Sequence, residues 1–158
     1  MKNNQLEELL KQHHNAAYFW ALQLCKYQED WAKEVLQMTY LKILDNKARY
    51  NQKSGFKTWL FSVIRFTTFD FLKDQQKFGT LNGLEVVQDT PTYEAELDLR
   101  PYLEQLPARQ KQVLLLAFYH DMSLSAIAEV LELHIGSVRT HYSRGKDALR
   151  TILKPVRS

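Results

Sequence analysis

Short polar and cationic side chains crowd one stretch near the end of the chain: Ser137, Arg139, Thr140, His141, Ser143, Arg144 and Lys146. Arginine pairs with a guanine edge through two hydrogen bonds, and serine or threonine hydroxyls contact bases or phosphates. Each good bidentate contact contributes about 1–3 kcal/mol of discrimination between bases. The chemistry that these residue types suit is therefore non-covalent recognition of DNA.

A pair of short helices is predicted to hold these side chains. Ser123 is a suitable N-cap for the first helix, and a brief turn at residues 132–134 leads into the second. The second helix has an inward stripe at helical spacing, formed by Val138, Tyr142, Gly145 and Leu149. With a supporting helix over residues 109–119, this pattern predicts a helix-turn-helix, whose first helix braces the second in the major groove. A plain helical hairpin with a basic solvent face fits the spacing equally well.

Side chains arranged for catalysis or metal binding are not found in the sequence. The five histidines and the single cysteine show no zinc-site spacing, and "GTLNG" lacks the lysine and the helix start of a phosphate-binding loop. Asp70 and Asp74 share a helix face, but Lys73 and Lys77 surround them, so we interpret these acids as ion partners. We expect a protein that is not an enzyme and that needs no metal or cofactor.

Bulk composition indicates a cytoplasmic globular protein. The 158 residues are 45% hydrophobic and 25% charged, which is enough for one ordinary domain or two small ones. No apolar run reaches the about 18 residues of a membrane span, and the polar N-terminus lacks a signal-peptide core, so no membrane insertion is expected. Cys25 alone cannot form an internal disulfide, which agrees with a reducing compartment.

The chain is predicted to be all-α, with two small helical domains joined by a flexible linker. Helical spacing covers nearly everything outside residues 79–91; one such stripe is Trp31, Val35, Met38, Leu41 and Leu44. Residues 1–78 contain 12 basic residues (Lys and Arg) and 8 acidic residues (Asp and Glu). Residues 79–101 contain 1 basic and 5 acidic residues, whereas residues 134–158 contain 6 basic residues and 1 acidic residue. We therefore expect domains at 1–78 and 96–158 and an acidic linker at 79–95.

Six aromatic residues lie within one predicted helix: Phe56, Trp59, Phe61, Phe66, Phe69 and Phe71. Their positions wrap around the whole helix, so one buried stripe cannot contain all of them, although most are expected in the core. Those left on the surface beside lysines and arginines suit unstacked bases, because stacking on an aromatic ring contributes about 1–3 kcal/mol per base.

The C-terminal segment "LPARQKQVLLLAFYHDMSLSAIAEVLELHIGSVRTHYSRGKDALR" resembles the promoter-binding domain of the bacterial sigma-70 family, in its extracytoplasmic-function (ECF) group. The matching residues include Leu106, Pro107, Arg109, Gln110, Val113, Ser123, Ile127, Ala128, Leu131, Gly136, Val138 and Arg144. The resemblance implies that this domain recognises the minus-thirty-five element. Three positions depart from the family pattern: Glu132 replaces the usual Gly, His134 a Ser or Thr, and Gly145 an Ala. A glycine inside the helix is expected to cost about 1 kcal/mol relative to alanine.

The segment "SGFKTWLFSVIRFTTFDFLKDQQK" resembles the minus-ten domain of the same family, with Phe66 in place of a common Asn. The resemblance implies that this region recognises the minus-ten element and traps melted bases, and that the preceding loop receives a flipped base. The DNA-binding residues implied are Lys47, Arg49, Asn51, Lys53, Lys57, Trp59, Arg65, Phe66, Lys73 and Lys77.

A third segment, "AKEVLQMTYLKIL", resembles the helix with which these factors bind the clamp helices of the polymerase, although Met38 replaces the family's final acid. The implied contacts are Glu34, Gln37, Leu41 and Lys42. Together the resemblances imply a sigma factor that binds core RNA polymerase and promoter DNA, directs promoter-specific initiation, and has an anti-sigma factor as a further partner.

Two other functions fit the residues. One is a free-standing helix-turn-helix regulator that binds an operator as a dimer, which requires half-sites about one helical turn apart. The other is a sigma-like scaffold that serves only to bind a regulator. A regulator is expected to bind DNA tightly by itself, whereas a sigma factor is expected to bind its promoter well only with core polymerase. A scaffold is expected not to bind DNA under either condition.

Overall fold

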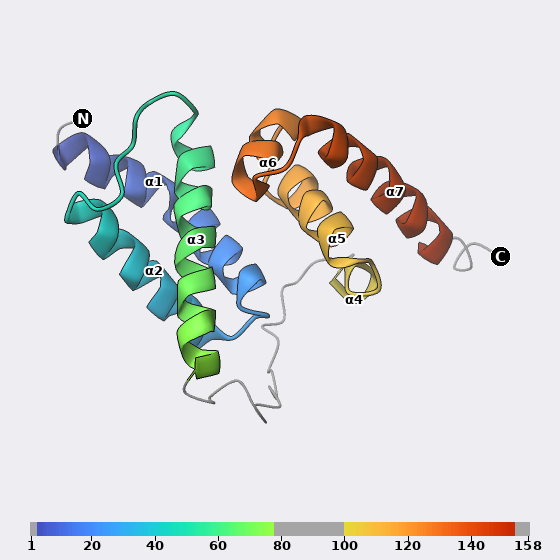
Figure 1. Ribbon diagram of the computed structural model, residues 1–158, viewed down its shortest axis with the longest axis horizontal. Helices are drawn as coiled ribbons and strands as arrows, with labels where there is room; N and C mark the ends of the chain where they lie inside the picture. Colours follow the sequence, from blue (N-terminus) through green and yellow to red (C-terminus); the bar gives the residue numbers. More distant parts are fainter. Residues whose placement is uncertain (1–2, 78–99, 154–158) are drawn as a thin grey trace. The chain divides into compact units, whose positions relative to one another are not determined.

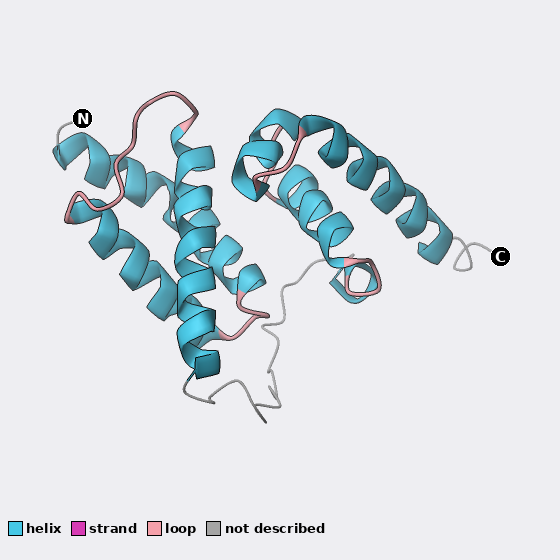
Figure 2. Ribbon diagram, in the orientation of Figure 1, coloured by secondary structure: helices cyan, strands magenta, loops and turns pink. Residues whose placement is uncertain are grey.

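The computed structural model of the chain describes residues 3–77 and 100–153 and contains helices but no strands in these two ranges (Figures 1 and 2). The chain divides into two compact units, Met1–Thr90 and Pro91–Ser158. The predicted all-α class is confirmed. The predicted linker at 79–95, and the domain boundaries on either side of it, lie outside the described residues. None of the described helices has the length and apolar character of a membrane span.

Three helices form the N-terminal module: α1 (Asn3–Leu24), α2 (Glu29–Leu44) and α3 (Phe56–Lys77), and each packs against the other two (Figure 1). Trp20 of α1 lies at the centre, with its ring stacked on Phe61 of α3 at 5.5 Å between centroids. The Trp20 Nε1–H donates a hydrogen bond to the Phe61 carbonyl at 3.1 Å, which satisfies the polar end of a buried indole. These two contacts fix the position of α3 along the axis of α1.

The buried stripe of α2 differs from the predicted one. Its buried residues are Ala32, Val35, Leu36, Thr39 and Ile43. Leu41 and Leu44, which belong to the apolar stripe of the sequence, are 52% and 48% exposed. The apolar stripe and the buried face differ because small and polar residues, Ala32 and Thr39, take inward positions. Thr39 Oγ1 donates to the Val35 carbonyl and so needs no water.

Between residues 100 and 153, the C-terminal module contains five elements: α4 (Arg100–Leu103), α5 (Ala108–Leu114), η1 (Leu115–Tyr119), α6 (Leu124–Leu131) and α7 (Ile135–Leu153). The range predicted as one helix, 109–119, is helical, but its last five residues form a π-helix closed by the bond from His120 N–H to the Leu115 carbonyl. Leu103, Leu106, Leu114 and Leu115 form a core cluster, against which α7 packs the side chains of Tyr142, Ala148, Leu149 and Ile152.

The predicted helix-turn-helix is confirmed by α6 and α7. The Ser123 hydroxyl accepts a hydrogen bond from Ala126 N–H at 3.1 Å, as expected of an N-cap. Helix α6 ends at Glu132, whose φ of 55° and ψ of 46° are left-handed. Glycine adopts this conformation without strain, and glutamate adopts it at some cost in energy. Glu132 therefore adopts at the turn a conformation that suits the glycine of the family pattern.

Gly145 lies on the face of α7 that packs tightly on α5. A Cβ built on Gly145 meets Leu114 Cδ1 at 3.1 Å and Leu114 Cγ at 3.2 Å. Gly136, in the first turn of the same helix, has nothing within 4 Å of its Cβ position. The close approach explains why a residue of low helix propensity stands at position 145 in the middle of α7.

Replacing Gly145 by leucine is expected to lower the free energy of unfolding of the C-terminal module by about 1–3 kcal/mol, because the added side chain overpacks against Leu114. Gly136→Ala, a helical glycine with open space, is expected to raise it by up to about 1 kcal/mol. Urea titrations followed by circular dichroism measure both changes. Equal stability of the Gly145→Leu variant and the parent would contradict the close packing of α5 and α7.

The thiol of Cys25 is buried in the N-terminal module, and burial raises its pKa to about 12. At pH 8 the thiolate fraction in the folded protein is then about one in ten thousand. We expect the native chain to react with a thiol reagent much more slowly than the urea-unfolded chain, at a rate that follows unfolding. A native rate equal to that of the unfolded chain would show that the site is open.

Candidate nucleic-acid interface

Helix α7 presents the predicted polar face. Exposed along it are Ser137, Arg139, Thr140, Ser143 and Arg144, while Val138 and Gly145 are buried on the opposite side. Two of the predicted residues lie at the margins of this face. His141 is half-buried, and its Nδ1 is enclosed without a hydrogen-bond partner in the described part of the chain. Lys146 is also half-buried, with its Nζ 5.0 Å from the centroid of the Tyr142 ring.

The arrangement of α7 suits reading of the major groove. The first helix of the motif, α6, packs against α7, and α5 packs on the buried side of α7, so the polar face is left open. The exposed arginines lie in the first three turns, where recognition helices make their base contacts. Arg150, near the end of the helix, lies 3.3 Å from Asp147 in an ion pair within α7.

The prediction that one helix cannot bury all six aromatics of residues 56–71 is confirmed by α3. Phe61 is fully buried, Phe56 and Phe71 are nearly so, and Trp59 is half-buried. Phe66 and Phe69 remain 46% and 45% exposed. An exposed phenyl ring offers its face to an unstacked base, so Phe66, which was predicted, and Phe69, which was not, form the aromatic surface of α3.

The cations of α3 differ in their accessibility. Arg65 is only 5% exposed, and its guanidinium carbon lies 4.5 Å from the centroid of the Phe69 ring. It therefore supports the exposed aromatic ring and does not lie on the open surface. Lys57 is half-buried over the Phe61 ring at 5.7 Å, and Lys73 is exposed. Lys77 ends the helix, and its side chain lies outside the described residues.

The loop between α2 and α3 carries its predicted residues on the surface. Lys47, Arg49, Asn51 and Lys53 are all exposed, and Asn51 Oδ1 accepts a hydrogen bond from Lys53 N–H at 3.0 Å. Tyr50 anchors the loop, since its ring lies 5.5 Å from Phe56 and 5.2 Å from Trp59. The basic side chains are therefore displayed around a fixed aromatic cluster.

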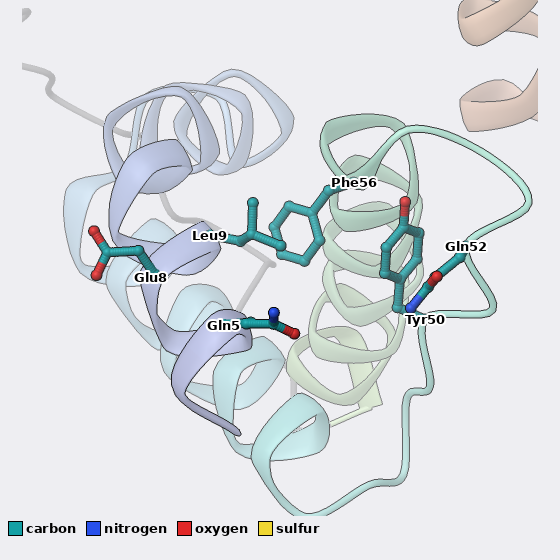
Figure 3. A pocket seen from close by; sticks show the side chains of 6 residues that line it. All are labelled: Gln5, Glu8, Leu9, Tyr50, Gln52 and Phe56. Carbon is teal, nitrogen blue, oxygen red and sulfur yellow. The ribbon is translucent and has the colours of Figure 1, made fainter. Parts of the chain in front are cut away.

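A hollow of about 700 Å³ opens between this loop and α1. Figure 3 shows the Phe56 ring facing Leu9 of α1, and Tyr50 and Gln52 extending from the loop beside them. The remaining lining residues are Gln5 and Glu8, also of α1. The hollow combines aromatic rings with amide groups, which suits a planar group that carries hydrogen-bonding edges.

The sequence did not identify this hollow because its walls come from segments about 40 residues apart, Gln5–Leu9 and Tyr50–Phe56. The sequence shows that "YNQKSGF" contains aromatic and amide side chains, but its spacing does not indicate that this segment packs against α1. Nearby, the pKa of His13 lies below its ordinary value because burial and then the charge of Lys57 disfavour the imidazolium form. The His13 ring lies 5.6 Å from that of Phe56, so it borders the aromatic side of the hollow.

The outer face of α2 carries three of the four residues predicted to bind polymerase. Glu34, Gln37 and Leu41 are exposed and lie at i, i+3 and i+7, with Leu44 following at i+10. Lys42 is directed differently: its Nζ donates to Thr67 Oγ1 at 3.1 Å and lies 3.6 Å from Asp70, both on α3. Leu41 and Leu44 thus form an exposed apolar pair beside two polar residues, as in a protein-binding face.

Comparison with known families finds two matches along the chain. The family model of sigma-70 region 2 matches residues 9–78, and that of sigma-70 region 4 matches residues 97–149. The first range contains α2, α3 and α1 from Leu9 onward, and the second contains the helix-turn-helix. Both predicted interfaces therefore fall inside matched ranges.

The chain is also similar to individual sigma factors over most of its length. The chain is 26% identical to RNA polymerase sigma factor SigV of Bacillus subtilis, covering 87% of this chain and 84% of that protein. It is 27% identical to ECF RNA polymerase sigma factor SigW of the same organism, covering 79% of this chain and 76% of that one. The fold is similar to that of sigma factor RpoE of Bartonella quintana, solved with the anti-sigma factor NepR, at a TM-score of 0.76 and 23% identity over 95% of this chain and 97% of that chain.

Proposed function

The chain belongs to the sigma-70 family of RNA polymerase sigma factors, in its ECF group, and on this premise we propose a division of labour between its two modules. The chain directs promoter-specific initiation of transcription as a subunit of RNA polymerase. The observation that carries this conclusion is that one chain holds both region 2 and region 4. A free-standing dimeric regulator needs a helix-turn-helix but has no use for region 2, so the sigma factor is favoured.

Helix α7 recognises the minus-thirty-five element in this proposal. Support comes from the open polar face of Ser137, Arg139, Thr140, Ser143 and Arg144, with α6 bracing it. Arginines in the first turns reach base edges, and the hydroxyls reach bases or phosphates. Lys146 and His141, at the margins of the face, suit contacts with the phosphate backbone.

The N-terminal module recognises and opens the minus-ten element. Phe66 and Phe69 offer stacking faces for melted bases, while Lys57 and Lys73 attract the phosphates. The hollow beside Tyr50 and Phe56 receives a flipped base, and the exposed residues Lys47, Arg49, Asn51 and Lys53 of the same loop contact the DNA around it. Stacking of about 1–3 kcal/mol per base partly offsets the energy of opening the duplex.

The outer face of α2 binds core RNA polymerase. Glu34, Gln37 and Leu41 supply the contact, and the exposed Leu44 extends it. Lys42 supports this face indirectly, because its bonds to Thr67 and Asp70 fix α2 against α3. An apolar pair surrounded by polar residues is the composition expected of a protein interface with a dry centre.

We further propose that an anti-sigma factor holds the chain inactive, that polymerase performs all the chemistry while this chain catalyses none, and that the protein acts in the cytoplasm. A solved structural neighbour is a sigma factor bound to the anti-sigma factor NepR, which supports the first point. Promoter recognition together with polymerase requires access to chromosomal DNA, which supports the cytoplasmic location.

Transcription from a randomised promoter library, with and without core polymerase, tests the proposed function. We expect the full chain to select promoters with two conserved elements when core polymerase is present and to bind the same DNA only weakly by itself. Tight binding of a palindromic site by the chain alone would overturn the proposal in favour of a dimeric regulator. Failure to bind either core polymerase or DNA would favour a scaffold.

A further inference from the structure

A stack of three side chains joins η1 to α7 at the margin of the recognition face. The ring of Phe118 lies on the ring of Tyr142 with 5.8 Å between centroids and 24° between planes. The Nζ of Lys146 lies 5.0 Å from the centroid of the same Tyr142 ring. The tyrosine is thus contacted by a phenyl ring and by a cation, in the offset and cation–π geometries that aromatic rings favour.

The fold builds this stack from separate segments. Phe118 comes from the π-helical turn Leu115–Tyr119, and it remains 58% exposed although it is stacked. Tyr142 and Lys146 stand at i and i+4 on α7 and are therefore neighbours on its surface. Tyr142 also packs against the core cluster of Leu103, Leu106, Leu114 and Leu115, so the base of the stack is rigid.

The position of Lys146 suits a phosphate better than a base. It stands in the fourth turn of α7, about 16 Å from the start of the helix, beyond the early turns that read base edges. A lysine there is a point charge on a flexible stem, which loses rotamer freedom when it binds. A ring that already holds the ammonium near its bound position reduces that loss.

We propose that Phe118 and Tyr142 are positioning residues that hold the Lys146 ammonium for contact with a DNA phosphate beside the minus-thirty-five element. This inference rests on the proposed DNA-binding role of α7. It gives the exposed ring of Phe118 a function, and it links the π-helical turn to the recognition helix. π-Helical turns recur at functional sites in other proteins.

A double-mutant cycle in the full chain, assembled with core polymerase on a labelled promoter from the library, tests the proposal. Lys146→Ala is expected to weaken promoter binding and to reduce the slope of log K against log salt by about 0.9, the value for one phosphate contact. Phe118→Ala is expected to weaken binding up to about fivefold, the upper value of an exposed cation–π contact, because the Phe118 ring supports the Tyr142 ring on which Lys146 lies. In the Lys146→Ala background the same Phe118 change is expected to have no further effect.

Matched variants separate positioning from stability. Tyr142→Phe keeps the ring and is expected to bind promoter like the parent, whereas Tyr142→Leu is expected to lose as much as Phe118→Ala. Tyr119→Ala removes an adjacent ring that is 54% exposed and lies against His120, and it is expected to change nothing. Thermal melting of each variant verifies that it is folded at the assay temperature.

Three results would overturn the proposal: full additivity of Phe118→Ala and Lys146→Ala, an unchanged salt slope for Lys146→Ala, or loss of polymerase assembly in Phe118→Ala, which would mark the ring as a protein contact. If Arg139→Ala or Arg144→Ala still weakens promoter binding in these cases, only the positioning inference fails. If those arginine variants also have no effect, the DNA-binding role of α7 fails with it.

Discussion

Alanine at Arg139 or Arg144 is expected to reduce promoter affinity of the assembled polymerase about tenfold or more, because a lost bidentate base contact removes about 1–3 kcal/mol. Both guanidinium groups lie on the exposed face of α7, whose opposite side is buried against α5, so the substitutions leave the core of the module intact. Binding to core polymerase is expected to stay unchanged. Promoter binding and polymerase association, measured on the same preparations, give the two values.

Arg150→Ala provides the matched control for these variants. Arg150 is an exposed arginine of the same helix, but it is paired with Asp147 and stands about 9 Å beyond Arg144 along the axis. We expect promoter affinity within about twofold of the parent, because an exposed ion pair contributes little. Equal losses of promoter binding and polymerase binding in the Arg139 and Arg144 variants would refute the assignment of this face to DNA.

Glutamate at Leu41 is expected to weaken association with core polymerase about ten- to hundredfold. The side chain is 52% exposed in the free chain, and burying a leucine contributes about 1.5–3 kcal/mol, which the charged residue forfeits while also resisting desolvation. Because the leucine lies outside the core, the stability of the module is expected to be unchanged. Titration of labelled polymerase with the variant measures the loss.

Gln12→Glu is the control for Leu41→Glu, since it introduces the same charge at an exposed position on α1 of the same module. We expect it to bind polymerase like the parent. Leu44→Glu, one turn beyond Leu41, is expected to show an intermediate loss if the apolar pair acts as one surface. Normal polymerase binding by the Leu41 variant would exclude the outer face of α2 as the contact.

Local patterns were enough to predict the helices α6 and α7 of the C-terminal module. Ser123 caps α6 as expected, and the polar face of α7 follows from the inward positions of Val138 and Gly145. Both features depend on neighbours within a few residues along the chain, and helical periodicity is set at that range. The exposure of some aromatic residues on α3 could be predicted in the same way, since six rings at these positions cannot all lie on one side of a helix.

Other features depend on which segments meet. Apolar spacing joins Leu41 and Leu44 to the stripe of Val35, but α1 and α3 pack on the face of α2 that carries Ala32 and Thr39. Arg65 was taken as a surface cation, and it is buried beneath Phe69. In both cases the exposure of the residue depends on which helices pack against its face, and the hydropathy of the residue does not determine that.

In the second half of the chain, apolar spacing fitted a helix-turn-helix and a plain hairpin equally well, and the resemblance to the sigma-70 family favoured the first. By itself, the local pattern of the sequence determined that the chain is helical and which side of α7 is polar. These properties come from backbone hydrogen bonding and periodicity within single segments. Only the tertiary structure decided the hollow between α1 and the loop, the close approach at Gly145 and the stack of Phe118 on Tyr142. Each of these joins residues more than twenty positions apart, and such contacts arise from packing of preformed helices, which no local pattern encodes.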